Sequence, residues 1–431
     1  MRLEAAATRI FAATTYSKRP NARRLRMRHF NLNDFIGRYV TERNESLFAA
    51  DLAANHDRLA AAIDGKSVLV IGGAGTIGSS YIRALLRFRP ARLYVIDTNE
   101  NGLTELTRDI RSTVGLHVPD DYKPYPINFG DPVFAKIFRN EGPFDIVANF
   151  AAHKHVRSEK DHYSIEAMVD NNVLKAKGLL NLLLEQPPAH FFCVSTDKAA
   201  NPVNVMGASK KLMEEVIMAY SAQLKISTAR FANVAFSNGS LLFGFIERMM
   251  KQQPLSSPTD VRRYFVSPEE SGQLCLLACL LGNSGDIFFP KLREEQMKTF
   301  AAIGEHFLRE YGGYTADRCA TETEAKEKAR QLDLSATAYP VYFFPTNTSG
   351  EKQFEEFYTG AEVVDQDRFE QLGVVTNTQR KSVEEIERMF VLLRTLFASE
   401  TLDKEAIVRL ITDFIPNFEH IETGRSLDQK M

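Results

Sequence analysis

The sequence predicts an α/β protein with a doubly wound parallel sheet, a smaller mixed α/β portion, and helical N- and C-terminal extensions. Three observations predict this fold class. Short apolar segments of strand length alternate with helical segments between residues 65 and 240, a glycine-rich turn follows the first apolar segment, and an aspartate ends the second. Such alternation is typical of a parallel sheet covered by helices on both faces.

The predicted strands are short and almost wholly apolar, as expected for strands buried on both faces. They lie at residues 67–71, 91–97, 145–150, 189–195 and 226–231. The segments between them have helical character, and we predict helices at residues 77–87, 102–114, 172–184 and 209–224.

The alternation ends after residue 240, which indicates a second, smaller portion. The remaining elements expected from periodicity are a helix at 242–252, an arm at 254–265, an apolar helix at 268–281, a charged, solvated helix at 316–336, a strand at 339–344 and one or two amphipathic helices at 382–413. The segment 343–352 is read as a functional loop. We therefore divide the chain into residues 1–30, 31–64 (a helical extension), 65–240 (the sheet domain), 241–380 (the second portion) and 381–431 (C-terminal helices).

The N-terminus is rich in arginine. Its first 28 residues contain seven Arg and one Lys, and Glu4 is the single acid. This composition fits a transit peptide, or an upstream segment of a chain that really starts at Met27, and we favour the second interpretation. Residues 31–62 show helical periodicity, and we expect them to pack on the main domain or on a second subunit.

The overall composition is that of an ordinary globular protein. Of 431 residues, 44% are hydrophobic and 25% are charged, and the net charge is −2. This balance gives no electrostatic basis for binding nucleic acid or an acidic membrane surface. No apolar run approaches the ~18 residues of a membrane span. We expect no membrane span, a cytoplasmic location and a homo-oligomer.

The four cysteines are too few and too scattered for a disulfide framework, which fits a reducing compartment. Cys275 and Cys279 are four residues apart on a predicted apolar helix. Metal binding and core packing both fit that spacing, and we favour core packing.

A nucleotide site is predicted where the first strand meets the first helix. The turn contains Gly72, Gly75, Thr76, Ile77 and Gly78. Glycines permit a tight turn and a close approach to a pyrophosphate, while the helix N-terminus supplies free N–H groups and a positive dipole end. Residues 65–240 are therefore predicted to form a Rossmann domain.

Asp97 ends the second strand, where a carboxylate accepts hydrogen bonds from both ribose hydroxyls of a dinucleotide and repels a 2′-phosphate. This favours NAD over NADP as the cofactor. The alternative role for Asp97 is a helix N-cap, since Thr98 and Asn99 follow. Asp131 is a candidate for the adenine end of the site, and a turn or cap role is equally compatible with its position.

More specific motifs follow in order along the chain. Residues 149–156 (Asn-Phe-Ala-Ala-His-Lys-His-Val) end one predicted strand, residues 195–202 (Ser-Thr-Asp-Lys-Ala-Ala-Asn-Pro) end another, and residues 205–210 (Val-Met-Gly-Ala-Ser-Lys) open the next helix. Residues 230–234, 237–240 and 263–265 come later. Over residues 65–290 the chain resembles UDP-N-acetylglucosamine 4,6-dehydratases of polysaccharide biosynthesis, which are extended short-chain dehydrogenases/reductases.

One residue departs from the superfamily pattern. Met206 stands where the catalytic tyrosine of the Tyr-x-x-x-Lys motif belongs, and a thioether carries no proton. The membrane-anchored, configuration-retaining branch of these dehydratases also has Met there. The chain is expected to resemble that branch without its membrane domain, and Met206 is expected to pack over the cofactor.

The resemblance implies a redox-neutral dehydration. Hydride leaves the sugar C4 for NAD, a base removes the C5 proton, an acid protonates the departing 6-hydroxyl, and the hydride returns at C6. The resemblance makes Lys198 the base and Asp197 the acid. Desolvation would lower the pKa of the lysine and raise that of the aspartate, but mutual attraction would oppose both shifts. We therefore expect the two side chains to diverge.

The resemblance also assigns supporting residues. Lys210 is expected to contact the nicotinamide ribose and Thr196 the sugar 4-hydroxyl. Whether Asp197, Thr196 through a water, or Lys210 takes the 4-hydroxyl proton stays open. Asn149 and Ala151 are expected to contact the cofactor. The predicted substrate contacts, which place substrate binding partly in residues 241–380, are His153, Lys154, His155, Asn233, Asn238 and Arg263.

Alternatives remain at these positions. The pair His153 and His155 cannot share a helix face and has no evident third ligand, so we expect no metal. Arg263 could bind a pyrophosphate bidentately or lie on the surface. For the whole protein the alternatives are a nucleotide-sugar epimerase of the same fold and, because the tyrosine is missing, a catalytically silent NAD-binding regulatory protein.

Overall fold

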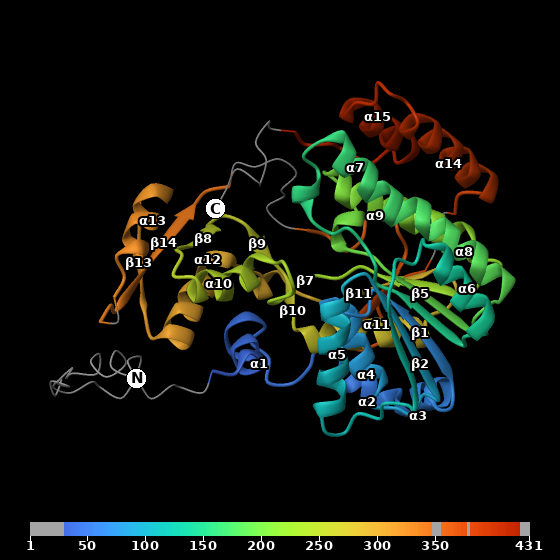
Figure 1. The fold of residues 1–431 in the computed structure, drawn as a ribbon, viewed down its shortest axis with the longest axis horizontal. Coiled ribbons are helices and arrows are strands. Elements are labelled where there is room, and N and C mark those ends of the chain that lie inside the picture. Colours follow the sequence, from blue (N-terminus) through green and yellow to red (C-terminus); the bar gives the residue numbers. More distant parts are fainter. Residues whose placement is uncertain (1–29, 334, 347–354, 377–379, 423–431) are drawn as a thin grey trace, which may run out of the picture.

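The computed structural model describes residues 30–333, 335–346, 355–376 and 380–422. Within them, one nine-stranded sheet has the order β15-β16-β11-β6-β5-β4-β1-β2-β3 (Figure 1). Its strands run parallel from β3 to β11, and β16 and β15 continue it antiparallel. The strands are β1 Ser67–Ile71, β2 Arg92–Asp97, β3 Asp121–Pro126, β4 Ile146–Asn149, β5 His190–Val194, β6 Ile226–Ala229, β11 Asp286–Pro290, β15 Val364–Asp365 and β16 Leu372–Val375.

Helices cover both faces of this sheet, which confirms the predicted doubly wound fold. On one face α4 packs against α11, and on the other α8 packs against α6 and α9 (Figure 1). The helices of this region are α4 Thr76–Leu85, α5 Glu100–Ser112, α6 Pro132–Glu141, α7 His162–Val169, α8 Lys175–Glu185, α9 Val205–Ala219 and α11 Pro268–Leu281. The central strands are buried along nearly their whole length because helices cover them from both sides.

Sequence periodicity missed β3 and α6. The strand reads Asp-Tyr-Lys-Pro-Tyr-Pro and lies at the edge of the sheet, where it is only partly buried. An edge strand tolerates proline because one side of its backbone needs no ladder partner. It therefore lacks the apolar run that identified the central strands.

The predicted boundary at residue 240 does not mark the end of the large sheet, because β11, β15 and β16 all come from beyond it. Sheet edges accept strands from distant segments, and periodicity does not report that pairing. The rest of the second portion is a small parallel sheet, β13-β14-β8, with helices around it. Its elements are α10 Leu241–Met250, β8 Leu255–Pro258, α12 Phe300–Phe307, β13 Thr315–Arg318, α13 Glu322–Arg330 and β14 Ala338–Phe344.

The charged helix predicted at 316–336 is shorter than expected, because its first residues form β13, which pairs with β14. Two short ladders complete the strand pairing. β7 Asn233–Val234 pairs with β10 Phe265–Val266 across the predicted boundary, and β9 Arg262–Arg263 pairs with β12 Lys298–Thr299 within the second portion.

The N-terminal extension is broken into short helices rather than one. They are α1 Leu32–Phe35, a π-helical turn Ile36–Val40, α2 Ala49–Ala54 and α3 His56–Ile63. Phe48, Leu59 and Ile63 are buried in the main core, and Phe35 and Ile36 are buried in the core of the second portion. The extension thus packs on its own chain, one of the two predicted arrangements. Residues 1–29, including Met27 and the arginine-rich segment, lie outside the described residues.

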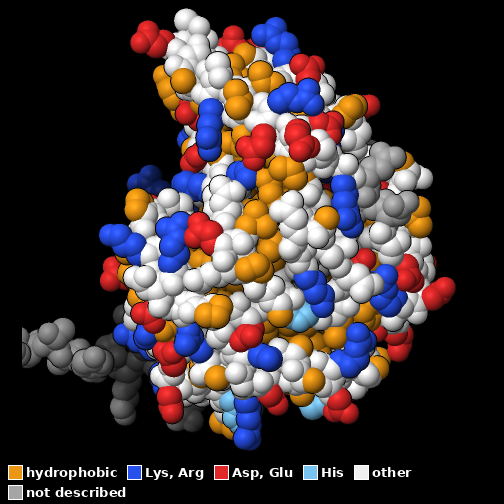
Figure 2. All heavy atoms as spheres, turned by 90° about the vertical axis from the view of Figure 1, so that its right-hand side faces the viewer, with side chains coloured by type: hydrophobic (Ala, Val, Ile, Leu, Met, Phe, Trp, Pro, Cys, Tyr) orange, Lys and Arg blue, Asp and Glu red, His pale blue; other side chains and the backbone are white. Residues whose placement is uncertain are grey.

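Two amphipathic helices, α14 Val383–Phe397 and α15 Lys404–Phe414, end the described chain. They pack beside α9 and α7 (Figure 1). Charged side chains of both signs are interspersed over the face shown in Figure 2. Among the described residues, none of the helices combines the length and the apolar character that crossing a bilayer requires.

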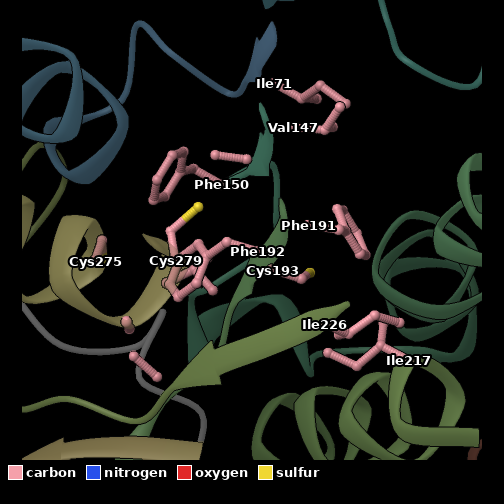
Figure 3. Packing of buried hydrophobic residues seen from close by; sticks show 14 of the residues in the cluster. Ile71, Val147, Phe150, Phe191, Phe192, Cys193, Ile217, Ile226, Cys275 and Cys279 are labelled. Carbon is pink, nitrogen blue, oxygen red and sulfur yellow. The ribbon is translucent and has the colours of Figure 1, made fainter. Parts of the chain in front are cut away.

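The predicted core role of Cys275 and Cys279 is confirmed. Both are buried free thiols on α11, packed among the aromatic side chains of the central strands (Figure 3). Burial raises the pKa of Cys279 to about 12, so this thiol stays protonated and is a poor metal ligand.

A buried charge network joins three distant segments. Arg230, which follows β6 and is fully buried, donates to both carboxylate oxygens of Glu214 on α9 at 2.7 and 2.9 Å. It also donates to both carboxylate oxygens of Glu362 at 2.8 and 2.9 Å and to the Phe357 carbonyl at 3.1 Å. Burial acts to raise the pKa of Glu214, but the Arg230 charge outweighs it and the pKa falls to about 2.

This network predicts a large stability loss in Arg230→Ala. We expect the free energy of unfolding in urea at neutral pH to fall by about 3–5 kcal/mol, because buried Glu214 loses its bidentate partner and keeps Lys211, at 3.6 Å, as its nearest cation. Arg139→Ala is the control, since it breaks the exposed Arg139–Glu185 pair and should leave the unfolding midpoint almost unchanged. Equal midpoints for the two variants would contradict this account.

Candidate active site

The glycine turn lies against the carboxyl end of β4. Gly72 has a φ of +76°, and a Cβ there would lie 2.5 Å from the backbone nitrogen of Ala151. A Cβ at Gly78 would lie 2.3 Å from the Gly72 carbonyl oxygen. Both positions therefore require glycine, one for conformation and both for space. The turn leads directly into α4, whose first residue is Thr76, as a dinucleotide-binding turn requires.

Asp97 lies beside this turn at the end of β2. Its carboxylate accepts hydrogen bonds from the backbone N–H of Ala74 and of Asn99, both at 2.9 Å. The N-cap of α5 is Asn99, which accepts from the Gly102 N–H, so the alternative of Asp97 as N-cap is wrong. Asp97 instead lines one open cleft together with the glycine turn, Ala151, His153 and Lys154. These residues suit the adenosine and pyrophosphate parts of a dinucleotide.

The side chains of Asp131 and Asn149 accept hydrogen bonds from nearby backbone N–H groups. Asp131 immediately precedes α6 and accepts from the Asn128 N–H at 3.1 Å, which is the turn role left open by the sequence. Asn128 lines the cleft, whereas Asp131 does not. Asn149 is buried at the end of β4 and accepts from the Ala151 N–H at 3.0 Å, so it shapes the strand end that faces the glycine turn.

The loop after β4 is held by a residue that sequence reasoning missed. Asn172 accepts from the His153 N–H at 2.8 Å and donates to the His153 carbonyl at 2.9 Å and to Ser209 on α9 at 3.0 Å. An asparagine inside a helical segment has no distinguishing pattern, so no signal in the sequence identified it.

Asn238 closes the cleft from the other side. Its N–H donates to the Thr76 hydroxyl at 2.9 Å, and its carbonyl accepts from the Lys154 ammonium at 3.0 Å. His155 lies against Gly239, next in the same loop. Asn233 precedes this loop in the sequence and lies in β7, which pairs with β10. The structure thus brings Thr76, Lys154 and Asn238 together.

The acid–base segment lies at the carboxyl end of β5, in a short 3-10 helix, Asp197–Ala199. Asp197 is 3% exposed, and one of its oxygens accepts from the Thr196 hydroxyl at 2.8 Å, the Lys198 N–H at 2.9 Å and the Lys198 ammonium at 3.0 Å. The expected divergence of the two side chains is therefore wrong. Mutual attraction in a buried site outweighs the separation that independent roles would favour.

Lys198 also faces Glu355, whose carboxylate lies 3.8 Å from the ammonium nitrogen. Burial acts to lower the pKa of Lys198, but the charges of Asp197 and Glu355 outweigh it and the pKa is raised. The opposition of these effects follows from the sequence but its outcome does not, because Glu355 comes from a segment more than 150 residues away.

The helix that follows carries Met206 and Lys210. It begins at Val205, where the motif 205–210 was expected to open a helix and four residues before the range 209–224 that periodicity predicts, because the Asn204 side chain caps it by accepting from the Gly207 N–H at 2.8 Å. Met206 is 4% exposed in the first turn. Lys210 is buried one turn later and donates to the Val194 carbonyl at the end of β5 at 2.6 Å, and burial lowers its pKa.

Arg263 is buried rather than on the surface. Its guanidinium lies 3.9 Å from Glu355, so these two residues join Asp197 and Lys198 in a group of two acids and two bases. Glu355 was missed by sequence reasoning. It follows the segment 343–352 that the sequence marked as functional, of which residues 347–352 lie outside the described residues.

Comparisons with known proteins identify a family that matches this chain and several proteins of similar sequence. The family described as "Polysaccharide biosynthesis protein" matches residues 68–327. The chain is 31% identical to an uncharacterized membrane protein of Methanocaldococcus jannaschii over 62% of this chain and 79% of that protein. It is 26% identical to the UDP-N-acetylglucosamine 4,6-dehydratase (inverting) of Campylobacter jejuni, over 55% and 70% respectively. It is 27% identical to the UDP-glucose 4-epimerase of Rickettsia felis, over 56% and 71%. Two longer polysaccharide-biosynthesis relatives are spanned by this chain over less than half their length.

Solved structures agree on the fold. Pen from Bacillus thuringiensis superimposes with a TM-score of 0.58 at 19% identity, covering 77% of this chain and 98% of that one. The dTDP-glucose 4,6-dehydratase DesIV from Streptomyces venezuelae, solved with NAD bound, superimposes with a TM-score of 0.51 at 17% identity, covering 76% and 97%. These likenesses place the chain in the same fold.

The glycine turn predicts a specific loss in Gly72→Ala. We expect NAD affinity, measured by calorimetric titration, to fall at least about tenfold, since a non-glycine residue at this φ costs about 1–2 kcal/mol and its Cβ would displace the end of β4. Gly178→Ala is the matched control, because Gly178 is exposed on α8 and a Cβ there meets no atom within 4 Å. Unchanged affinity in Gly72→Ala would show that this turn does not bind the cofactor.

Proposed function

The chain belongs to the polysaccharide biosynthesis protein family of extended short-chain dehydrogenases/reductases, and from that membership we propose that it is an NAD-dependent nucleotide-sugar 4,6-dehydratase. Its substrate is UDP-N-acetylglucosamine or a close relative. The single observation that carries the proposal is the buried contact between Asp197 and Lys198 at the carboxyl end of β5. Parallel α/β sheets bind ligands at that end, and dehydration needs one acid and one base close together.

The cofactor site supports NAD. Asp97 places a carboxylate beside the glycine turn, where it would accept hydrogen bonds from ribose hydroxyls and repel a 2′-phosphate. The hydroxyl of Thr76 and the loop at Asn238 lie at the start of α4, where a pyrophosphate would meet the helix N-terminus. When bound, NAD would accept the C4 hydride and return it at C6.

The contacts of Asp197 support a route for the 4-hydroxyl proton. Thr196 donates its hydroxyl hydrogen to the Asp197 carboxylate at 2.8 Å, so a sugar hydroxyl that donates to Thr196 can pass a proton to Asp197. Lys210 is a weaker candidate because its ammonium already donates to the Val194 carbonyl. Asp197, once protonated, is the acid that the departing 6-hydroxyl requires.

The same protonation prepares Lys198. Neutralising Asp197 removes one of the two negative charges that stabilise the Lys198 ammonium, and this favours the neutral amine. The resting ammonium gives its proton to solvent, and the resulting amine takes the C5 proton, which the C4 ketone has made acidic. The hydrogens of the ammonium so formed exchange with solvent before one of them is returned to C5, so Lys198 ends the cycle as the amine. The proton from the 4-hydroxyl leaves in water, so the cycle needs no net proton source. Met206 carries no proton and packs in the first turn of α9.

An epimerase is the second candidate, because UDP-glucose 4-epimerases are among the relatives at similar identity. A catalytically silent protein fits less well, since Asp197 and Lys210 are buried, and Lys198 is mostly buried, near one strand end. The homo-oligomer and the cytoplasmic location stay predictions.

Product analysis tests the function directly. UDP-N-acetylglucosamine incubated with the protein in heavy water, without added reductant, should give a 4-keto-6-deoxy sugar that has lost one water and carries deuterium at C5. Mass spectrometry and proton NMR distinguish the outcomes. An unchanged mass with altered stereochemistry would support the epimerase, and unchanged starting material with tight NAD binding would support the silent protein.

Two variants separate the roles of the acid and the base. With the 4-keto-6-deoxy product as the substrate, exchange of the C5 proton in heavy water needs the base and no oxidation at C4. We expect Lys198→Met to lose this exchange by about 10²–10⁴-fold and Asp197→Asn to keep most of it, while both lose dehydration of the parent sugar to that extent. Retained exchange in Lys198→Met would assign the base elsewhere.

A further inference from the structure

Glu355 brings a charge to the site from outside the region that matches the family. The match ends at residue 327, and Glu355 lies in the segment between β14 and β15. Its side chain is 5% exposed, and its carboxylate lies 3.8 Å from the Lys198 ammonium and 3.9 Å from the Arg263 guanidinium. A buried carboxylate is costly unless cations face it, so this placement joins the C-terminal segment to the acid–base pair.

The residues that follow Glu355 are firmly anchored. Glu356 accepts from the Asn201 side chain at 2.8 Å, in the segment that leads from the acid–base pair to α9. The Phe357 carbonyl accepts from Arg230 at 3.1 Å. The first of these contacts comes from the loop after Asp197 and Lys198 and the second from the residue after β6, so the segment of Glu355 is tied to the loop that carries Lys198.

We propose that Glu355 is a positioning residue of this site, which faces both Lys198 and Arg263 and controls the charge on Lys198. The effect of Glu355 on catalysis rests on the proposed function, in which Lys198 is the base of the dehydration. The geometry requires no direct hydrogen bond, because at 3.8 and 3.9 Å the carboxylate acts through its charge, and a buried charge at that range is only weakly screened.

Among the residues that the structure describes, the charged groups that face Lys198 are Asp197 from its own turn, Glu355 from the C-terminal segment and Arg263 from β9. The two carboxylates favour the ammonium and the guanidinium opposes it. When Asp197 takes a proton during the reaction, Glu355 is the remaining negative charge that faces Lys198 among these groups. It then decides how readily Lys198 becomes the amine that can accept the C5 proton.

The charge on Lys198 can be measured without turnover. Competitive acetylation with acetic anhydride over a range of pH, followed by peptide mass spectrometry, reports how the amine fraction of Lys198 rises with pH. In Glu355→Gln we expect the labelling midpoint of Lys198 to move to lower pH, because the variant removes a charge that stabilises the ammonium, and labelling at neutral pH to rise severalfold. This result does not depend on which reaction the protein catalyses.

Glu356→Gln is the matched control. It removes the same charge one residue later, where the side chain is exposed, and glutamine can still accept from Asn201. Its Lys198 midpoint should equal that of the wild type. Equal midpoints in Glu355→Gln and the wild type would overturn the proposal. If Glu355→Gln does not fold, Glu355→Asp provides the test, since withdrawing the carboxylate by one methylene should move the midpoint in the same direction, and no movement would overturn the proposal.

Activity provides the second readout once dehydration has been demonstrated. In Glu355→Gln we expect the part of the kcat–pH profile that reports deprotonation of Lys198 to move to lower pH. We expect kcat on the plateau above it to fall severalfold, because an amine of lower pKa is a weaker base, with a smaller change in KM. A loss of kcat with that part of the profile unmoved would show a merely structural role and overturn the proposal. Absence of dehydration in the wild type would instead refute the proposed function and leave the labelling result standing.

Discussion

The buried contact of Arg230 with Glu214 and Glu362 is the interaction on which the arrangement of the site depends. It joins the end of β6, the helix that carries Met206 and the C-terminal segment that carries Glu355. Removing one member of such a network leaves an uncompensated charge in the interior, so the three segments are held as one unit. Few apolar contacts could fix three segments with the same directional precision, because hydrophobic packing has no preferred direction.

The acid–base group is built on the frame that this network supports. Its two carboxylates and two cations are nearly buried and face one another at 3.0 to 3.9 Å. In such a group, protonation of one carboxylate changes the proton affinity of the neighbouring lysine. The proposed chemistry therefore depends on redistribution of protons inside the group rather than on one side chain with an independently shifted pKa.

Much of this could be predicted from the sequence, and the failures have identifiable causes. The central strands and their helices were found because burial on both faces leaves a continuous apolar run. The edge strand β3 was missed because its prolines and exposed side chains leave no such run. Periodicity placed the start of α9 late because capping by Asn204 is a local hydrogen bond that periodicity does not report. The expected divergence of the Asp197 and Lys198 side chains is wrong, because in the buried site the attraction between the two charges holds them in contact.

By itself the sequence determined the parallel sheet, the glycine turn at Gly72, the position of Asp97 and the presence of Asp197 and Lys198 at one strand end. Each of these is a local pattern, read from neighbouring residues. The tertiary structure alone decided that β11, β15 and β16 extend the same sheet, that Arg263 is buried and that Glu355 faces Lys198. These facts depend on contacts between segments separated by many residues, and their energy comes from desolvation and charge pairing that exist only after the chain has folded.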